Sequence, residues 1–248
     1  MNPIIQSQLQ HRTYRQFDAG VKIPADEVQL LLDATRQAPS WMNGQHYTII
    51  RVTDPALRAR IVDAQPNNPQ IGTCAEYWVF VADVRRAMLG SKVYGGSFTA
   101  VGTPDTLITL VTDAALAAQN AVVAAESLGY GTCFTGGIRL IGPELVEWLG
   151  LPEYTYPLFG LCIGKPAVEM QVKPRLPQHA VVAENRYPTD ETLDAALADY
   201  EATMTAFGEA REKFPFRQKF SNYYSQEYAP RNAKLLRDQG LLTSPEGL

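Results

Sequence analysis

Residues 130–139 read Tyr-Gly-Thr-Cys-Phe-Thr-Gly-Gly-Ile-Arg and lie between a long apolar segment and a short helix predicted to follow Pro143. Gly136 and Gly137 lack side chains, so the backbone there is free to adopt unusual φ and ψ angles, and a flat molecule is able to approach it closely. Exposed N–H groups in such a turn suit an anion or an electron-rich ring atom. A plain turn explains the two glycines as well as a binding site does, so the pair alone does not decide between them.

The segment before this stretch is predicted to be the central helix of the core. Over residues 105–128, apolar side chains recur at helical spacing, and many of them are alanines. Small side chains let neighbouring elements approach closely, and Gly129 is well placed to end the helix. Two near-continuous apolar segments, 76–84 and 156–163, predict strands that are buried on both faces.

The remaining pattern predicts one domain followed by a C-terminal excursion. Shorter helices are predicted over 3–10, 24–36, 54–64 (capped by Asp54), 144–149 and 190–207, with a further strand over 46–52 and a loop over 92–104. There is no internal repeat and no clear linker before about residue 200, so we expect a domain over residues 1–207. The segment 208–248 is rich in charged and aromatic residues, and we expect it to pack on a partner subunit or near the active site.

Composition narrows the class of protein. The 248-residue chain is 46% hydrophobic and 19% charged, which is typical of a soluble globular protein, and its net charge of −4 argues against nucleic acid as a partner. No apolar run approaches the ~18 residues of a membrane span without polar interruption. The N-terminal residues lack the pattern of a signal peptide. We therefore expect a cytoplasmic protein with no membrane partner.

The cysteines and histidines favour neither disulfides nor a metal site. Cys74, Cys133 and Cys162 lie far apart in apolar or glycine-rich segments, as expected of reduced, buried thiols. The three histidines show no metal-ligand spacing. We therefore predict no bound metal.

Two clusters of basic residues are candidates for an anion site. Arg12 and Arg15 flank hydroxyl-bearing residues and could converge on an anion or a carbonyl edge, although a solvated basic loop would look the same. Lys173 and Arg175 are separated by one proline and followed by another, which keeps the chain extended and places both on one side of it. This rigidity distinguishes the second cluster from an ordinary surface pair.

The loop 38–45, Ala-Pro-Ser-Trp-Met-Asn-Gly-Gln, carries two large apolar side chains among turn-forming residues. Trp41 and Met42 could pin the loop to the core or line a pocket, and the sequence leaves both open. An indole outside the core needs another flat apolar surface to cover it.

Six short motifs follow one another in a specific order. They are His-Arg-Thr-Tyr-Arg-x-Phe at 11–17, Ala-Pro-Ser at 38–40 with Asn43 and Gln45, Ala-Ala-Glu-Ser-Leu-Gly-Tyr-Gly-Thr-Cys at 124–133, Gly-Gly-Ile-Arg at 136–139, Pro-Leu-Phe-Gly-Leu-Cys-Ile-Gly at 157–164 and Lys-Pro-Arg-Leu-Pro at 173–177. Together they resemble the FMN-dependent nitroreductase family, most closely its NADPH-dependent, oxygen-insensitive nitroreductase and flavin reductase branch. Each motif is weak by itself, and six in sequence are a strong signal.

The resemblance implies an α+β fold, with a central, mostly antiparallel sheet flanked by helices, in an intertwined homodimer that binds two FMN molecules at its interface. It also implies an oxidoreductase that takes a hydride from NADPH and reduces small nitroaromatic or quinone-type acceptors by a ping-pong mechanism. Because FMN carries the chemistry, no side chain is assigned a catalytic role.

The resemblance also assigns residues to the cofactor. Arg12 and Thr13, with Lys173 and Arg175, would bind the FMN phosphate, and Arg15 would approach the pyrimidine edge of the flavin. The guanidinium there would favour negative charge on that edge.

Other positions would contact the ring or the ribityl chain. Ser40 and Asn43 would reach the flavin from the partner subunit, and backbone N–H groups at 136–137 would lie near its reactive nitrogen. His11 and Glu126 also match family positions, although a loop-fixing histidine and a locally satisfied carboxylate explain them as well. The complete set of predicted cofactor contacts is His11, Arg12, Thr13, Arg15, Ser40, Trp41, Asn43, Asn68, Thr135, Gly136, Gly137, Lys173 and Arg175.

Reductant and acceptor are predicted to contact further residues. NADPH carries a phosphate that NADH lacks, and we predict that Arg211, Lys213 or Arg217 binds it, with Arg217 the best single candidate. Trp41 and Met42 stand where many relatives have small serines, so Trp41 either covers the acceptor pocket or anchors the loop.

Two further departures weaken the transfer of single residues but not of the cofactor. Asn68 stands where relatives often carry glutamine, and Arg139 is followed by Leu-Ile-Gly rather than Asn-Asn.

Two alternative functions remain open. One is a flavin reductase that releases reduced FMN to a partner enzyme, and the other is a flavin-binding protein without turnover, for storage or sensing. The sequence does not name the physiological acceptor.

Overall fold

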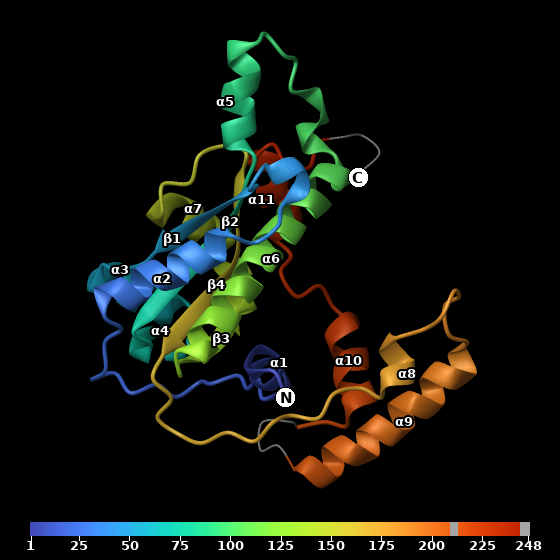
Figure 1. Ribbon diagram of the computed structural model, residues 1–248. Coiled ribbons are helices and arrows are strands. Elements are labelled where there is room, and N and C mark those ends of the chain that lie inside the picture. Colours follow the sequence, from blue (N-terminus) through green and yellow to red (C-terminus); the bar gives the residue numbers. More distant parts are fainter. Residues whose placement is uncertain (209–212, 244–248) are drawn as a thin grey trace. The chain divides into compact units, whose positions relative to one another are not determined.

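The computed structural model describes residues 1–208 and 213–243, which form an α+β fold (Figure 1). Among these residues the sheet has four strands in the order β1-β2-β4-β3, and every neighbouring pair is antiparallel. The strands are β1 (Tyr47–Arg51), β2 (Glu76–Asp83), β3 (Gly131–Thr135) and β4 (Thr155–Gly164). The predicted α+β class with an antiparallel sheet is confirmed.

The central strands β2 and β4 are buried on both faces, as their apolar sequences predict. One face of the sheet is covered by α6 (Pro104–Ser127), with α2 (Ala25–Arg36) beside it (Figure 1). Alanines of α6 share a core cluster with Trp78 and Phe80, because small side chains let the helix approach the aromatic rings of β2. The predicted central helix is therefore confirmed.

Side chains that alternate with these along β2 face the opposite side of the sheet. There Val79 packs in a second core cluster with Ile61 of α3 (Pro55–Ala64) and Leu145 of α7 (Gly142–Trp148). Leu145 and Ile61 are fully buried. The sheet thus separates two apolar cores within one unit.

Helix starts follow the capping residues that the sequence offers. The side chain of Asp54 accepts the N–H of Ala56 at 2.9 Å, which confirms it as the cap of α3. Thr103 accepts the N–H of Thr106 at the start of α6. The other helical elements are α1 (Pro3–Leu9), α4 (Gln70–Thr73), α5 (Arg85–Val93), α8 (Gln178–Val181), α9 (Asp190–Phe207), α10 (Phe216–Tyr224), α11 (Asn232–Asp238), and the short 3₁₀ helices η1 (Trp41–Asn43), η2 (Thr99–Gly102) and η3 (Gly136–Ile141).

Some local structure departs from the sequence-based expectation. The stretch 130–139 contains strand β3, which the sequence did not predict. Its residues have no strand pattern of their own, and the segment becomes a strand by pairing with β4. Gly136 and Gly137 do not take positive φ angles; they begin η3. The segment expected to be a loop at 92–104 holds the end of α5 and η2.

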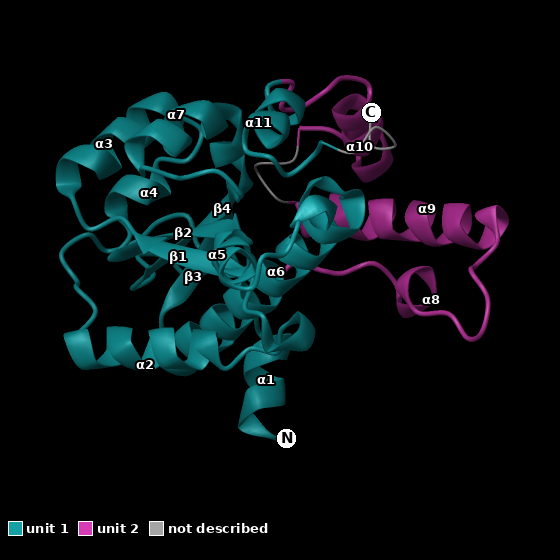
Figure 2. Cartoon of the chain, turned by 90° about the horizontal axis from the view of Figure 1, so that it is seen from above, with its two compact units in different colours: residues 1–170, 231–248 teal, residues 171–230 magenta. Residues whose placement is uncertain are grey.

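The chain forms two compact units (Figure 2). Unit 1 comprises residues 1–170 and the chain from 231 onward, and unit 2 comprises residues 171–230. The boundary expected at 207/208 falls inside unit 2, whereas α11 belongs to unit 1 and buries Leu235 in its core. Part of the C-terminal segment therefore packs on its own chain.

Among the described residues, helix α6 is a candidate membrane span by its length and hydropathy alone. Seven of its apolar side chains, including Leu110, Ala117 and Ala121, are buried in the core cluster that also contains residues of β2. This packing is that of a core helix.

Candidate functional site

Strand β3 organises the candidate site in unit 1. Thr13 forms a parallel bridge with Thr132 of β3, and the N–H of Tyr14 donates to the carbonyl of Thr132 at 2.9 Å. A Cβ on Gly131 would lie 2.5 Å from the Tyr14 ring, so this close approach requires glycine. The predicted contacts Arg12, Thr13 and Arg15 therefore belong to a segment that lies beside β3, the strand that ends at Thr135 just before the glycine pair.

The N-terminal segment is also tied to α6. Nδ1 of His11 and Oε1 of Glu126 are 2.5 Å apart, and both side chains are mostly buried. A carboxylate only accepts hydrogen bonds, so Nδ1 of His11 carries the hydrogen. The loop-fixing role that the sequence allows for His11 is thus present in the structure, and Glu126 is its partner.

Arg12 presents a donor that nothing in the described chain satisfies. Its Nε is buried and has no hydrogen-bond partner among residues 1–208 and 213–243. Nη2 lies 3.4 Å from Oε1 of Gln10 and 4.0 Å from the exposed Glu169. Arg12 also lines a cavity of about 210 Å³ together with Tyr14 and Glu126. A buried guanidinium nitrogen without an acceptor suits an anionic ligand.

Asn68 reaches the same strand through a buried amide. Nε2 of Gln70 lies 3.2 Å from Oδ1 of Asn68 and 3.6 Å from Sγ of Cys133, which belongs to β3. Gln70 is 3% exposed. The sequence did not single out Gln70, because a lone polar residue outside any predicted element gives no sign that it will be buried.

The end of β3 leads into the glycine pair. The Thr135 hydroxyl is fully buried and lies 3.1 Å from the Tyr77 hydroxyl, so its side chain serves the core. Burial raises the pKa of Tyr77 far above its ordinary value, which keeps that hydroxyl neutral. A Cβ on Gly136 would come within 3.3 Å of the guanidinium of Arg139. The first N–H groups of a 3₁₀ helix have no partner inside the helix, and η3 begins with those of Gly136 and Gly137.

The loop that carries Ser40 to Asn43 is anchored elsewhere on α6. The buried carboxylate of Asp113 accepts the backbone N–H of Trp41 at 2.8 Å. The side chains of Trp41 and Met42 are 64% and 87% exposed, so they do not pin the loop to the core of this chain. From Asp113 to Glu126 the helix rises about 20 Å, so the anchors of this loop and of the His11 segment are far apart along α6.

In unit 2, Lys173 and Arg175 lie in an extended segment. Nη1 of Arg175 donates to the carbonyl of Lys173 at 2.7 Å, and the hydroxyl of Tyr200 on α9 donates to the carbonyl of Pro174 at 2.9 Å. The stiff conformation expected from the prolines is therefore supported by contacts with α9.

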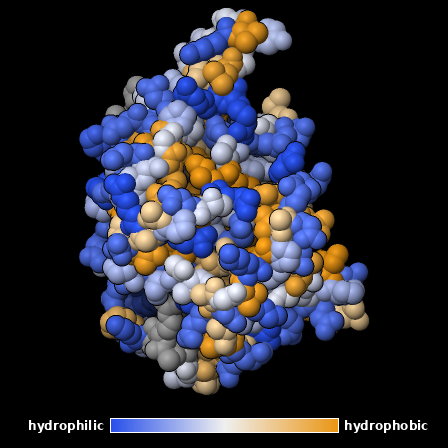
Figure 3. Space-filling view, turned by 90° about the vertical axis from the view of Figure 1, so that its left-hand side faces the viewer, coloured by the Kyte–Doolittle hydropathy of each residue, from blue (hydrophilic) through white to orange (hydrophobic). Residues whose placement is uncertain are grey.

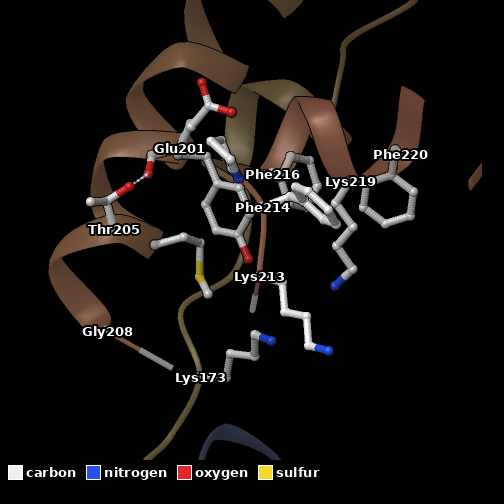
Figure 4. Close-up of a pocket in the computed structure, with 12 residues that line it drawn as sticks. Lys173, Glu201, Thr205, Gly208, Lys213, Phe214, Phe216, Lys219 and Phe220 are labelled. Carbon is white, nitrogen blue, oxygen red and sulfur yellow. Dashed lines mark hydrogen bonds between the residues drawn. The ribbon is translucent and has the colours of Figure 1, made fainter. Parts of the chain in front are cut away.

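Unit 2 also contains a cavity of about 520 Å³ with basic and aromatic walls. Figure 4 shows Lys173, Lys213 and Lys219 directed toward the same region, beside phenylalanine rings. The rings at the wall belong to Phe214, Phe216 and Phe220. This combination suits a ligand that has both a flat ring and negative charge.

Arg217 is occupied by carboxylates. Its guanidinium lies 3.0 Å from Glu201 and 3.1 Å from Asp194, and hydrogen bonds from its backbone N–H and guanidinium lower the pKa of Glu201. Lys213 lines the cavity instead, and Arg211 lies outside the described residues.

Comparison with known proteins identifies the class to which this fold and site belong. The chain matches the model of the nitroreductase family over residues 9–165 and the C-terminal domain of that family over residues 173–244. It therefore belongs to the nitroreductase family. The first range lies within residues 1–170, the N-terminal part of unit 1. The second range covers unit 2 from residue 173 and then the part of unit 1 that follows residue 230.

Individual relatives cover nearly the whole chain. An FMN reductase [NAD(P)H] of Bacillus subtilis is 31% identical over 97% of this chain and 98% of its own length. An oxygen-insensitive NADPH nitroreductase of Salmonella typhimurium is 38% identical over 82% of this chain and 84% of its own length. The solved structure of the NADPH:FMN oxidoreductase from Vibrio harveyi complexed with NAD⁺ superimposes with a TM-score of 0.89 at 31% identity and covers 98% of this chain and 100% of that chain.

Proposed function

We propose that this protein is an FMN-dependent oxidoreductase that takes a hydride from NADPH and reduces small nitroaromatic or quinone-type molecules by a ping-pong mechanism. Membership of the nitroreductase family and the names of its relatives support this function. When bound, FMN supplies the capacity to accept a hydride and to pass electrons on, and the chain binds, orients and shields it. The buried, free cysteines fit a reducing compartment such as the cytoplasm.

The observation that carries the proposal is the convergence of three separate segments on β3. The segment with Arg12 and Arg15 pairs with the strand, Asn68 is linked to it through Gln70, and Gly136 continues it. The unpartnered Nε of Arg12 fits an anion such as the FMN phosphate. Lys173 and Arg175 are proposed to bind the phosphate as well, by their resemblance to the family.

The test is the state of the purified protein. We expect it to be yellow, with the absorbance of FMN, and NADPH is expected to bleach that absorbance in the absence of oxygen. Protein that binds FMN but is bleached slowly or not at all by NADPH would favour a storage or sensing role. Colourless protein that takes up no added FMN would contradict the proposal.

Release of reduced FMN is the second candidate, since one relative is an NADPH-flavin oxidoreductase of Vibrio harveyi. Free FMN added during steady-state turnover separates the two functions. An enzyme that supplies reduced FMN uses the added FMN as an electron acceptor. A nitroreductase that holds its cofactor tightly does not reduce the added FMN.

We further propose a homodimer in which the loop 40–45 of one copy completes the flavin site of the other. The loop and the His11 segment are anchored at distant points of α6 within one chain, which supports a site shared between copies. Apolar residues are exposed along α6. The most exposed of them on α6 are Ile108 (65%), Leu116 (40%) and Val111 (39%). On the face that lies to the left in Figure 1, apolar side chains are also visible among hydrophilic ones (Figure 3).

For the reductant, we propose that the cavity of unit 2 receives the phosphate that distinguishes NADPH from NADH. Lys213 is the residue we assign to it, in preference to Arg217, whose guanidinium is already paired. Lys213→Ala is expected to raise the KM for NADPH about tenfold, the equivalent of about 1.4 kcal/mol, and to leave the KM for NADH nearly unchanged. Steady-state kinetics with both nucleotides measures this.

Two variants control this prediction. Lys22→Ala removes an exposed lysine of unit 1 and should change neither KM. Arg217→Ala should lower the melting temperature of the protein without changing the preference for NADPH, because it breaks the ion pairs with Asp194 and Glu201. Equal losses for both nucleotides in Lys213→Ala would instead indicate a role in folding.

We propose that Trp41 covers the acceptor pocket, with Met42 beside it. Because Trp41 is 64% exposed, Trp41→Ser is expected to change the free energy of unfolding by less than about 0.5 kcal/mol. The relative kcat/KM for small and large quinones should change, while FMN content stays the same. If Trp41→Ser ranks the acceptors as the unmodified protein does, the assignment of Trp41 to the acceptor pocket is wrong.

A further inference from the structure

The loop between α2 and β1 adopts a costly backbone. Met42, Asn43 and Gln45 have φ angles of 50°, 56° and 49°, a region that residues other than glycine rarely occupy. Such residues persist only where the surrounding structure compensates for the strain. The apolar side chains of Trp41 and Met42 point away from the core and make no such compensation.

One buried carboxylate holds both ends of this turn. Oδ1 of Asp113 accepts the backbone N–H of Trp41 at 2.8 Å, and Oδ2 accepts the backbone N–H of His46 at 3.1 Å. Oδ2 also lies 2.8 Å from Nδ1 of His46. The Asp113 side chain is 2% exposed, and the described residues provide no arginine or lysine ion pair to it. Its hydrogen bonds are therefore directed to the loop.

The His46 ring completes the turn from inside. A Cβ on Gly44 would lie 2.2 Å from Cε1 of His46, so the imidazole occupies the space beneath the glycine. Because a carboxylate is an acceptor, Nδ1 carries the hydrogen in this contact. Ring and carboxylate thus fix the position of the exposed residues 41–43.

A second carboxylate acts on the same loop from β2. Asp83 binds Nη1 of Arg86 at 2.9 Å, and Nη2 of Arg86 donates to the carbonyls of Gln45 and Tyr47. This contact fixes where the loop enters β1. Within the loop, the Ser40 hydroxyl accepts the backbone N–H of Gln45 at 3.1 Å, and Nε2 of Gln45 donates to the carbonyl of Asn43 at 3.2 Å. The contact that ties the segment 41–43 to α6 comes from Asp113.

We propose that Asp113 and His46 are positioning residues for the acceptor, which act by holding Trp41 over the pocket. The inference rests on the proposed function, because it assigns a second pair of residues to the acceptor side of that site. Neither side chain contacts FMN or acceptor in this assignment. They set the discrimination between acceptors through the backbone of the loop.

The test combines variants at these positions with Trp41→Ser. Asp113→Asn replaces an acceptor oxygen by an NH₂ group and so removes hydrogen bonds at little change in volume. We expect the ratio of kcat/KM for small over large quinones to shift about tenfold, in the same direction as in Trp41→Ser, as misplacement by about 1 Å can produce. The double variant should shift no further than either single variant, because both changes act through one contact.

Histidine variants provide a rescue. His46→Asn keeps an N–H donor that is able to reach Asp113 and should restore most of the original ratio, whereas His46→Leu should not. Glu76→Gln is the matched control, since Glu76 is a largely buried carboxylate that binds Arg51 and Trp78 at the other end of β1. It should leave acceptor ranking unchanged.

Two readouts separate this inference from the proposed function. Bound FMN in Asp113→Asn should still be bleached by NADPH in the absence of oxygen, and failure of both proteins to bleach would contradict the proposed function itself. Normal bleaching with an unchanged acceptor ratio in Asp113→Asn and His46→Leu would overturn the positioning role, as would additive shifts with Trp41→Ser. If Asp113→Asn does not fold, the histidine pair alone decides.

Discussion

Arg12→Ala is expected to yield protein that purifies mostly without flavin. The Nε of Arg12 is buried and has no acceptor within the described residues, and it lies beside the segment that pairs with β3. Hydrogen bonds to a charged group contribute about 1.5–3 kcal/mol, so loss of this guanidinium should weaken FMN binding roughly 10- to 150-fold. The ratio of flavin absorbance to protein absorbance after purification, and titration of the apoprotein with FMN, measure this.

Matched substitutions define the control. Arg36→Ala removes an exposed arginine whose only described ion pair is with Asp33 on the same helix, and it should keep its flavin. Arg175→Ala is expected to lose flavin as Arg12→Ala does, whereas Arg186→Ala, an exposed arginine of unit 2, is not. Equal flavin content in Arg12→Ala and Arg36→Ala would remove Arg12 from the phosphate site.

The second large effect concerns α6. Leu116→Glu should convert the proposed homodimer into monomers that carry little flavin. Leu116 is 40% exposed in one chain, so the fold of that chain tolerates a carboxylate there. In a dimer interface the same carboxylate would be buried without a partner, which costs several kcal/mol. Size-exclusion chromatography with light scattering reports the mass, and absorbance reports the flavin.

Leu116→Met is the companion variant, because it keeps the volume and the apolar character of the side chain. It should remain dimeric and yellow. A dimeric, flavin-loaded Leu116→Glu protein would place the interface on another surface. Monomeric unmodified protein with full flavin content would contradict the shared site altogether.

Elements with strong patterns were predictable from the sequence. The alanine-rich periodicity of 105–128 gave α6, and the apolar segments 76–84 and 156–163 gave two buried strands. The helix predicted over 190–207 matches α9 at both ends. These signals are local, because the spacing of apolar residues within one segment determines which face it buries.

Elements with a weak local sequence pattern could not be predicted from the sequence. Strand β3 is short and begins with glycine and threonine, and only its ladder with β4 makes it a strand. Helix α5, Arg-Arg-Ala-Met-Leu-Gly-Ser-Lys-Val, was missed because no side chain caps its start and Gly90 lowers its helix propensity.

The candidate site likewise has features that the sequence predicted and features that it did not. Six ordered motifs in the sequence identified the family, and with it the cofactor and the basic residues around it. Arg217 was favoured for the NADPH phosphate because its charge is visible in the sequence, whereas its pairing with Asp194 and Glu201, 23 and 16 residues away, is not.

What the sequence by itself determined is therefore the identity of the main elements, the family and the residue types of the site. The tertiary structure decided which of those residues are held, and by what. Asp113 lies 72 residues from Trp41 and 67 from His46, and no local pattern connects them. Only the packing of α6 on the sheet brings the carboxylate under the loop, and a hydrogen bond depends on the position of both partners to within a few tenths of an ångström.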